Sequence, residues 1–183
     1  MAGYHLDFNN ADIWYASVQK CFGLPSGMAI LICSPKAVDR AKELNINQHY
    51  NDYSFILQNT LKHQTTHTPN ILGIYLLYKL LADLPCIEKI HKKVLEKSKA
   101  WYTYLEEHPS LSPLISSNNV RSPTVIAVQS DVKAISSLLE ECEKEGFLLG
   151  KGYGKWKKNT FRIANFPAIE KKEIELLKHF FNQ

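Results

Sequence analysis

The first half of the chain places short, continuous apolar segments between polar loops. Residues 13–18 are rich in aromatic and branched side chains, and residues 28–33 form an unbroken apolar run bounded by Gly27 on one side and Ser34 on the other. Continuous apolar runs of this length between turn-forming residues are typical of strands that are covered on both faces. The pattern therefore predicts two buried strands.

Two helices are predicted where a hydroxyl residue stands directly before a proline. Ser34 and Thr68 each occupy such a position, which suits an N-cap followed by the first helical residue. The first helix is expected to run toward Leu44. The second runs through Leu81 and is apolar nearly all round, so we expect it to be buried on several sides. Residues 45–65 are polar, aromatic and poorly periodic, and we interpret them as a loop with an uncertain helix.

The second half of the chain begins with a long amphipathic helix. Apolar residues at helical spacing form one stripe from Ile87 to Leu105, and His108 with a following proline ends the pattern. Beyond it, the pattern predicts a strand, a helix, a strand and a helix, at residues 124–128, 132–142, 161–164 and 174–181. This order indicates a small α+β unit, which the long helix joins to the first half.

Composition and charge narrow the class of protein. Of the 183 residues, 45% are hydrophobic, and 22 Lys and Arg stand against 18 Asp and Glu, which excludes an intrinsically disordered chain. The formal net charge of +4 permits a nucleic-acid partner without implying one. The four cysteines show no CxxC spacing, so we expect reduced thiols.

The apolar pattern predicts neither an export signal nor a membrane span. The N-terminus lacks a basic region followed by an apolar stretch. The longest apolar run, residues 71–84, is interrupted by Lys79 and Asp83 and is shorter than the ~20 residues that span a bilayer. We expect a soluble, cytoplasmic protein with no membrane partner.

The most informative segment follows the first predicted strand. Lys20 lies where that strand gives way to a loop that contains Gly23, Pro25 and Gly27. An amine held in a desolvating pocket at such a junction has a lowered pKa and becomes a nucleophile toward a carbonyl group. The alternative is a solvent-facing loop lysine, which is the commoner role for a lysine taken at random.

The residues around this lysine resemble a known family. Residues 12–27, DIWYASVQKCFGLPSG, are similar to the cofactor-lysine segment of class V, fold-type I aminotransferases, which use pyridoxal phosphate (PLP). The Gln19-Lys20 pair points to the phosphoserine aminotransferase branch. The resemblance implies that Lys20 bonds covalently to PLP and moves the proton during transamination, while Gln19 lies against the cofactor.

A second stretch, residues 67–70, is similar to the family's Asn-Thr-Pro segment, with His67 in place of the usual Asn. The resemblance implies that Thr68 reaches the PLP phosphate of the neighbouring subunit of a homodimer, with His67 beside the cofactor. A helix start also attracts anions by itself, because its N–H groups and the positive end of its dipole face outward. An ordinary capped helix would explain the same residues without any ligand.

A third stretch, residues 161–168, resembles the C-terminal strand that bears the family's carboxylate-binding arginine. Of the three arginines, Arg40, Arg121 and Arg162, only Arg162 lies within a predicted apolar strand. An unpaired charge there would be costly, so we expect an anionic partner. The resemblance makes this partner the α-carboxylate of the substrate, which a planar guanidinium binds with two parallel hydrogen bonds. A structural ion pair with Asp or Glu is the alternative.

Residues 150–158 form a basic loop that also carries glycines and aromatic rings. By itself such a loop could bind a phosphate or a nucleic acid. In well-studied phosphoserine aminotransferases, a His-Arg pair near this point helps to bind the substrate's phosphate. Here Tyr153 and several lysines, among them Lys151, stand in that region, and we expect Tyr153 and Lys151 to bind substrate.

Other kinds of site lack their motifs. The histidines show no ligand spacing such as HExxH, so we expect no metal site. The chain also has no GxSxG sequence and no P-loop, which disfavours hydrolysis and nucleotide binding.

The resemblance extends over essentially the whole chain but corresponds to only the C-terminal half of a family member. It implies a partial α/β fold of the PLP-dependent transferase fold type I. Residues 1–100 would be the C-terminal part of the large PLP-binding domain with the linking helix, and residues 101–183 the small C-terminal α+β domain. The upstream half would carry the Gly-rich phosphate turn, the ring that stacks on the pyridine and the Asp that pairs with its nitrogen. We therefore expect a poor enzyme when this chain is alone, with apolar strand edges and helix faces exposed.

The sequence is compatible with several functions. The leading hypothesis is a phosphoserine aminotransferase-like fragment that transfers an amino group between an amino acid and a 2-oxo acid, as a homodimer or paired with the missing N-terminal half. A class V transaminase of the alanine or serine–glyoxylate type would use the same residues. Two alternatives come from other classes. One is a non-catalytic α/β interaction module or remnant, and the other is a nucleic-acid-binding domain that uses residues 151–158, although we expect no nucleic-acid partner.

Overall fold

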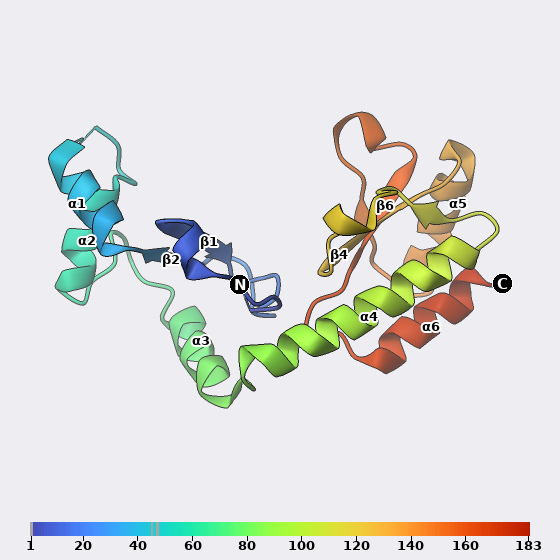
Figure 1. Cartoon of the computed structure of the whole chain (residues 1–183), viewed down its shortest axis with the longest axis horizontal. Helices are drawn as coiled ribbons and strands as arrows, with labels where there is room; N and C mark the ends of the chain where they lie inside the picture. The colour runs from blue at the N-terminus through green and yellow to red at the C-terminus, as the bar shows by residue number, and fades with distance from the viewer. Residues whose placement is uncertain (1, 45, 47) are drawn as a thin grey trace. The chain divides into compact units, whose positions relative to one another are not determined.

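The computed structural model describes residues 2–44, 46 and 48–183, which group into two compact units. Unit 1 comprises Leu6–Leu84, and unit 2 comprises Ala2–His5 together with Pro85–Gln183 (Figure 1). The elements of unit 1 are the 3-10 helix η1 (Phe8–Asn10), strands β1 (Ile13–Ser17) and β2 (Ala29–Cys33), and helices α1 (Pro35–Leu44), α2 (Tyr53–Leu61) and α3 (Ile71–Asp83). Those of unit 2 are α4 (Ile87–Glu107), β3 (Ser112–Pro113), η2 (Asn118–Val120), β4 (Val125–Gln129), α5 (Val132–Lys144), β5 (Gly150–Lys151), η3 (Gly154–Trp156), β6 (Thr160–Ala164) and α6 (Lys171–Phe181).

Strands β1 and β2 form an antiparallel pair in which Ile13 lies opposite Cys33 and Ser17 opposite Ala29. The two predicted strands are thus confirmed, but their predicted burial is wrong. Ile13 is 53% exposed and Tyr15 is 68% exposed. Over the part of the chain that the structure describes, this sheet has only two strands. A sheet this narrow cannot enclose its own apolar side chains.

Helix α1 begins as the sequence predicts. The Ser34 hydroxyl accepts a hydrogen bond from the Ala37 N–H at 3.1 Å and donates one to the Asp12 carboxylate at 2.7 Å. Pro35 is the first helical residue, where a missing N–H costs nothing. The hydrogen bond from Ser34, together with Lys36 at 3.3 Å, holds the pKa of the Asp12 carboxyl below its usual value. These contacts tie the start of α1 to Asp12, the residue before β1.

Helix α2 lies within the region interpreted as a loop. Asp52 is its N-cap, and the Asp52 side chain accepts a hydrogen bond from the Ser54 N–H at 2.8 Å. The uncertain helix of this region is therefore present over residues 53–61, where a good cap compensates for weak hydrophobic periodicity. Positions 45 and 47 of that predicted loop lie outside the described residues.

Helix α3 begins at Ile71, two residues later than predicted. Its N-cap is Asn70 and not Thr68, because the Asn70 side-chain oxygen accepts a hydrogen bond from the Gly73 N–H at 2.9 Å. Asn and Thr both cap helices, but a helix has only one N-cap position. Asn70 holds it because Asn70 stands three residues before Gly73, whose N–H its side chain accepts. The predicted Thr68 cap is therefore wrong.

The predicted burial of α3 is also wrong. No residue of the helix is buried, and Ile71, Leu72 and Tyr78 are 72%, 67% and 65% exposed. A helix that is apolar all round requires neighbours on several sides. Within unit 1, the described residues do not supply them.

Unit 2 is built on a four-stranded antiparallel sheet in the order β3-β4-β6-β5. Side chains alternate along the two central strands. Ile126 and Val128 of β4 and Phe161 and Ile163 of β6 are buried on one face. Arg162, which lies between the two buried residues of β6, points to the other face.

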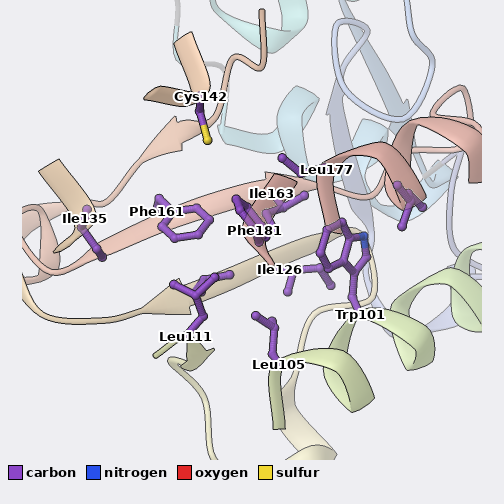
Figure 2. Close-up of a cluster of buried hydrophobic side chains, with 12 residues drawn as sticks. Trp101, Leu105, Leu111, Ile126, Ile135, Cys142, Phe161, Ile163, Leu177 and Phe181 are labelled. Atoms are coloured by element: carbon purple, nitrogen blue, oxygen red, sulfur yellow. The ribbon is translucent and has the colours of Figure 1, made fainter. Parts of the chain in front are cut away.

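Helices α4, α5 and α6 supply the rest of the core of unit 2. Figure 2 shows Trp101 and Leu105 of α4 near Ile126, with Phe161 and Phe181 close by. The ring centroids of Phe161 and Phe181 are 5.9 Å apart in an edge-on arrangement, which favours aromatic contact. In Figure 1, α4 and α6 lie side by side, and the Tyr104 hydroxyl donates to the Lys178 carbonyl between them.

The end of β6 is fixed to α4 by two polar side chains. The Asn165 amide donates to the Val94 carbonyl at 3.1 Å and to the Pro123 carbonyl at 2.7 Å, in a fully buried position. The Lys97 ammonium donates to the Phe166 and Ile169 carbonyls, both at 2.8 Å. These contacts fix the strand that carries Arg162 relative to the long helix.

The predicted helix and strand order of unit 2 is confirmed, including the apolar stripe of α4. The linking helix packs with the C-terminal unit, so the compact units divide between Leu84 and Pro85. The predicted domain boundary at residue 100 refers to the complete family fold, and it stays a prediction. No helix in the described ranges is long and apolar enough to cross a membrane.

The leucines of α4 allow a matched test of the core. Leu105 is 1% exposed and Leu95 is 42% exposed, so Leu105→Ala removes packing that Leu95→Ala does not. We expect Leu105→Ala to lower the free energy of unfolding of unit 2 by about 2–5 kcal/mol, and Leu95→Ala by less than about 1 kcal/mol. Urea unfolding followed by circular dichroism measures both. Equal losses would contradict the described core.

Thiol chemistry tests the same core independently. Cys142 is fully buried, and this burial raises the pKa of its thiol to about 11, whereas Cys86 is exposed. Because the thiolate is the reactive form, an aromatic disulfide reagent at pH 8 should modify Cys86 in the folded chain and reach Cys142 only on unfolding. Peptide mapping after timed quenching checks this order, and Cys142 modified as fast as Cys86 would refute it.

Candidate functional site

Lys20 lies in the tight turn that follows β1. The Gly23 N–H donates to the Lys20 carbonyl at 2.9 Å, and the Leu24 N–H donates to the Val18 carbonyl at 3.1 Å. Gly23 has φ +67°, a left-handed conformation that glycine adopts without strain. Val18 and Phe22 are buried and anchor the turn on both sides of the lysine. The sequence therefore folds this segment so that the backbone at position 20 is held firmly.

The Lys20 and Gln19 side chains are both exposed. The desolvating pocket expected around the lysine amine is thus not provided by the described part of unit 1. An exposed amine at a rigid turn can reach a carbonyl compound, but its activation requires further groups around it.

The loop after Lys20 lies against the start of α3. A Cβ placed on Gly27 would lie 3.8 Å from the Asn70 side-chain nitrogen, so the two segments are neighbours in unit 1. Gly27 has φ +114°, which disfavours any other residue there. The structure therefore brings the segments of Lys20 and Thr68 together, although they are far apart in sequence.

The start of α3 is already partly occupied by contacts within the chain. The Ile71 N–H donates to the Pro69 carbonyl at 3.0 Å, and the Gly73 N–H donates to Asn70. Fewer amides face outward than a helix start normally offers. The Thr68 side chain is exposed, and its hydroxyl makes no hydrogen bond within the described residues.

His67 lines a hollow of about 430 Å³ beside Pro69 and Ile74. Its ring nitrogen Nδ1 lies 3.0 Å from the Thr66 hydroxyl, and its ring meets that of Tyr50 edge-on at 5.7 Å. His67 is therefore held by its neighbours, on the same stretch as the Thr68 hydroxyl.

Arg162 sits at the centre of the second predicted group. In the register of the sheet it lies opposite Ala127 of β4 and Gly150 of β5. Its Nε donates to the Lys151 carbonyl at 3.0 Å, and its Cζ lies 5.0 Å from the centre of the Tyr153 ring. Unit 2 thus brings the Tyr153 ring and the Arg162 guanidinium together. Lys151 contributes its backbone carbonyl, but it lies opposite Phe161, so its side chain belongs to the other face of the sheet.

The ion pair offered as the alternative for Arg162 is absent from the described part of the chain. Arg121, in contrast, pairs with Glu106 at 2.5 Å, and Arg40 pairs with Glu43 at 3.1 Å. Arg162 is half-buried and carries its charge without an internal carboxylate. Its two terminal nitrogens are therefore available to an anion from outside.

The loop that carries Tyr153 is closed tightly on β6. The Gly152 N–H donates to the Thr160 carbonyl at 3.1 Å, and the Thr160 hydroxyl donates to the Trp156 carbonyl at 2.7 Å. A Cβ on Gly152 would meet the Thr160 hydroxyl at 2.1 Å, so only glycine fits there. The Lys155 ammonium stacks over Trp156 at 4.8 Å. These contacts keep the loop over the same face of the sheet as Arg162.

Two residues at these sites were not predicted. Asn70 caps α3, and its signal in the sequence was the amide side chain three residues before Gly73. Gly150 lies across from Arg162, and nothing in the sequence alone indicates that pairing. Within the described ranges, no group of three or more His, Cys, Asp or Glu could hold a metal ion.

The predicted residues thus form two groups. Gln19, Lys20, His67 and Thr68 belong to unit 1, and Lys151, Tyr153 and Arg162 belong to unit 2. The roles predicted for both groups stay predictions.

Comparison with known proteins gives one consistent family. The model of the aminotransferase class-V family matches residues 4–154. The chain is 27% identical to the phosphoserine aminotransferase of Corynebacterium glutamicum (strain R), over 96% of this chain and 49% of that protein. It is 25% identical to the phosphoserine aminotransferase of a Nocardioides species, again over 96% and 49%. The chain spans about half the length of the curated relatives that it matches.

Solved structures give the same result. A phosphoserine aminotransferase from Cytophaga hutchinsonii matches with a TM-score of 0.83 at 30% identity, over 96% of this chain and 50% of that one. The phosphoserine aminotransferase of Bacillus circulans subsp. alkalophilus matches with a TM-score of 0.80 at 20% identity, over 100% and 49%. At that identity the second match shows the fold alone. The predicted partial α/β fold is confirmed.

The caps of α3 can be tested by one pair of substitutions. Asn70→Ala removes the side chain that accepts from the Gly73 N–H, whereas Thr68→Ala removes a hydroxyl that caps nothing. We expect Asn70→Ala to lower the free energy of unfolding of unit 1 by about 1 kcal/mol and Thr68→Ala by less than about 0.5 kcal/mol. Thermal unfolding followed by circular dichroism measures both, and a larger loss for Thr68→Ala would show that the predicted cap was right.

Proposed function

Because the chain belongs to the class-V aminotransferase family, we propose that it provides the C-terminal half of a PLP-dependent aminotransferase, with Lys20 as the lysine that bonds to the cofactor. The observation that carries this proposal is the approach of the Lys20 loop to the start of α3, at Gly27 and Asn70. This contact places the segment that bears the Lys20 amine beside the segment that bears the Thr68 hydroxyl. By the family resemblance, Lys20 would bond to one cofactor, and Thr68 would serve the phosphate of the cofactor in the neighbouring subunit.

The residues present fit part of the cofactor. Lys20 offers an exposed amine for its aldehyde carbon. The Thr68 hydroxyl, with no hydrogen bond inside the described residues, suits the phosphate of the cofactor in the neighbouring subunit. His67 and Gln19 lie next in sequence to these two and would contact the cofactor from the same segments. We assign no residue of this chain to the stack on the pyridine ring or to the partner of the pyridine nitrogen.

When bound, PLP supplies an electron sink that stabilises negative charge at the α-carbon of an amino acid. The residues of this chain would move the proton and bind the substrate. The Lys20 amine would take the proton from the α-carbon and deliver it to the carbon on the other side of the amino nitrogen. Arg162 would bind the α-carboxylate of the amino acid through two parallel hydrogen bonds.

The proposed substrates are an amino acid that carries a second anionic group, such as phosphoserine, and a 2-oxo acid such as 2-oxoglutarate. Support comes from the names of the relatives and from the basic loop that carries Lys155 and Lys157 between β5 and β6. An aminotransferase of the alanine–glyoxylate type is the alternative within the family. A structure so named matches with a TM-score of 0.79 at 20% identity, which supports the fold alone.

We also propose that the active assembly contains more than this chain, either a homodimer or a pairing with an N-terminal half. The exposed apolar side chains of β1 and α3, such as Tyr15 and Leu72, support this. Contiguous apolar surface of this kind is typical of protein interfaces. The same exposure favours a second candidate function, a non-catalytic interaction module that keeps the fold without the chemistry. A role in serine biosynthesis in the cytoplasm follows from the first proposal.

The role of Lys20 is testable by substitution in the assembled enzyme. The chain is co-expressed with the N-terminal half of a phosphoserine aminotransferase relative, and transamination of phosphoserine with 2-oxoglutarate is measured. Lys20→Ala should lower kcat by at least about a hundredfold, because the proton-transfer group is lost. Lys36→Ala, an exposed lysine that pairs with Asp12, is the control and should change little. Unchanged activity in Lys20→Ala would reject the assignment, and a folded, inactive assembly would favour the interaction module.

Arg162 should affect a different kinetic constant. Arg162→Leu removes the carboxylate fork and should raise the KM for the amino donor by about tenfold or more, while the cofactor absorbance of the assembly stays unchanged. Arg40→Leu, an exposed arginine already paired with Glu43, is the matched control. An unchanged KM in Arg162→Leu would remove this residue from the site.

A further inference from the structure

We propose that Tyr153 and Gly150 are positioning residues that hold the Arg162 guanidinium so that a carboxylate is bound end-on, through its two terminal nitrogens. This inference rests on the proposed function, because it concerns the way in which Arg162 presents its hydrogen-bond donors. Tyr153 thereby acts through the arginine and not on the substrate directly.

Arg162 uses one of its hydrogen-bond donors within the chain and leaves the others open. A guanidinium can bind a carboxylate side-on, through Nε and one terminal nitrogen, or end-on, through both terminal nitrogens. The single hydrogen of Nε is directed at the Lys151 carbonyl at 3.0 Å. The side-on mode is therefore closed by the backbone of β5, and the end-on mode remains.

The Tyr153 ring holds the plane of the Arg162 guanidinium. Tyr153 lies with its ring centre 5.0 Å from Cζ, so the ring covers one face of the cation. The Nε hydrogen bond alone fixes one edge, and the ring restricts rotation of the plane about that edge. The ring itself is 74% exposed, whereas the arginine is half-buried, so the ring shields the cation on its solvent side.

Gly150 keeps space open beside the terminal nitrogens of Arg162. Gly150 lies directly opposite Arg162 in the sheet, and a Cβ at that position would lie 3.5 Å from Nη2. A methyl group would therefore touch the guanidinium, and a branched side chain would fill the space that a carboxylate oxygen needs. Glycine at this position keeps Nη2 accessible.

Arg121 also lies against a tyrosine ring, but its guanidinium is paired within the chain. Its Cζ lies 4.7 Å from the Tyr102 ring centre, but its Nη1 pairs with Glu106. Its Nε donates to the Ile115 carbonyl at 2.8 Å. Its donors are thus consumed within the protein, whereas Arg162 has its terminal nitrogens open. The Tyr102–Arg121 pair is therefore a matched structural control.

The experiment uses the isolated 183-residue chain with ¹⁵N-labelled arginine, because three arginines give three resolvable Nε–H signals. Sodium glutarate is the probe, and sodium chloride at equal ionic strength is the blank. The Arg162 signal should exchange slowly with solvent and keep its position, while its terminal N–H signals shift with added glutarate. A shift of the Nε–H signal as large as that of the terminal groups would show side-on binding and overturn the inference.

Variants then separate positioning from structure. Tyr153→Leu should weaken glutarate binding about 2–5-fold, the range expected for a cation–π contact at an exposed site, and Tyr153→Phe should restore it. Gly150→Val should weaken binding at least as much while the Nε–H signal of Arg162 persists, which shows that β5 still pairs. Tyr102→Leu should leave glutarate binding unchanged.

The outcomes also distinguish this inference from the proposed function. If Arg162→Leu leaves glutarate binding unchanged, the carboxylate role of Arg162 itself fails. If Arg162→Leu abolishes binding but Tyr153→Leu and Gly150→Val have no effect, the positioning inference is wrong and the role of Arg162 stands.

Discussion

The alternation of side chains along β6 is the constraint on which unit 2 depends. Phe161 and Ile163 must face the helices to complete the core, and this requirement alone turns Arg162 to the opposite face. A slip of one residue would expose two large apolar side chains and bury a charge. The same pairing with β4 and β5 that stabilises the unit therefore also sets the position of its candidate carboxylate site.

Unit 1 differs from unit 2, because its helices are fixed by local caps and its apolar side chains are incompletely packed. The Ser34, Asp52 and Asn70 caps each satisfy their helix with a nearby side chain. Yet β1, β2 and α3 leave apolar side chains exposed, and the chain spans about half the length of its relatives. The candidate cofactor site lies in this unit, at a turn whose backbone is well held and whose lysine side chain is exposed. Completion of the site thus depends on groups that cover the same apolar surfaces.

The sequence predicted what depends on neighbours along the chain and missed what depends on neighbours in space. Strands at residues 13–18 and 161–164 and the stripe of α4 follow from periodicity, and the Lys20 and Arg162 segments follow from resemblance to a family. The burial of α3 could not be predicted, because it is a property of the surrounding structure and not of the helix. The contact of Tyr153 with Arg162 also depends on tertiary structure, since it arises from the closed turn at Gly152 and the pairing of β5 with β6.

The central claim is that Lys20 is the residue that bonds to the cofactor, and one measurement tests it most directly. The chain is co-expressed with the N-terminal half of a phosphoserine aminotransferase relative, and the purified assembly is mixed with PLP, reduced with borohydride and digested. The labelled peptides of this chain are then identified by mass spectrometry. The account predicts a label concentrated on Lys20, with little on other exposed lysines such as Lys36. Label spread over many lysines, or concentrated at a site other than Lys20, would contradict it.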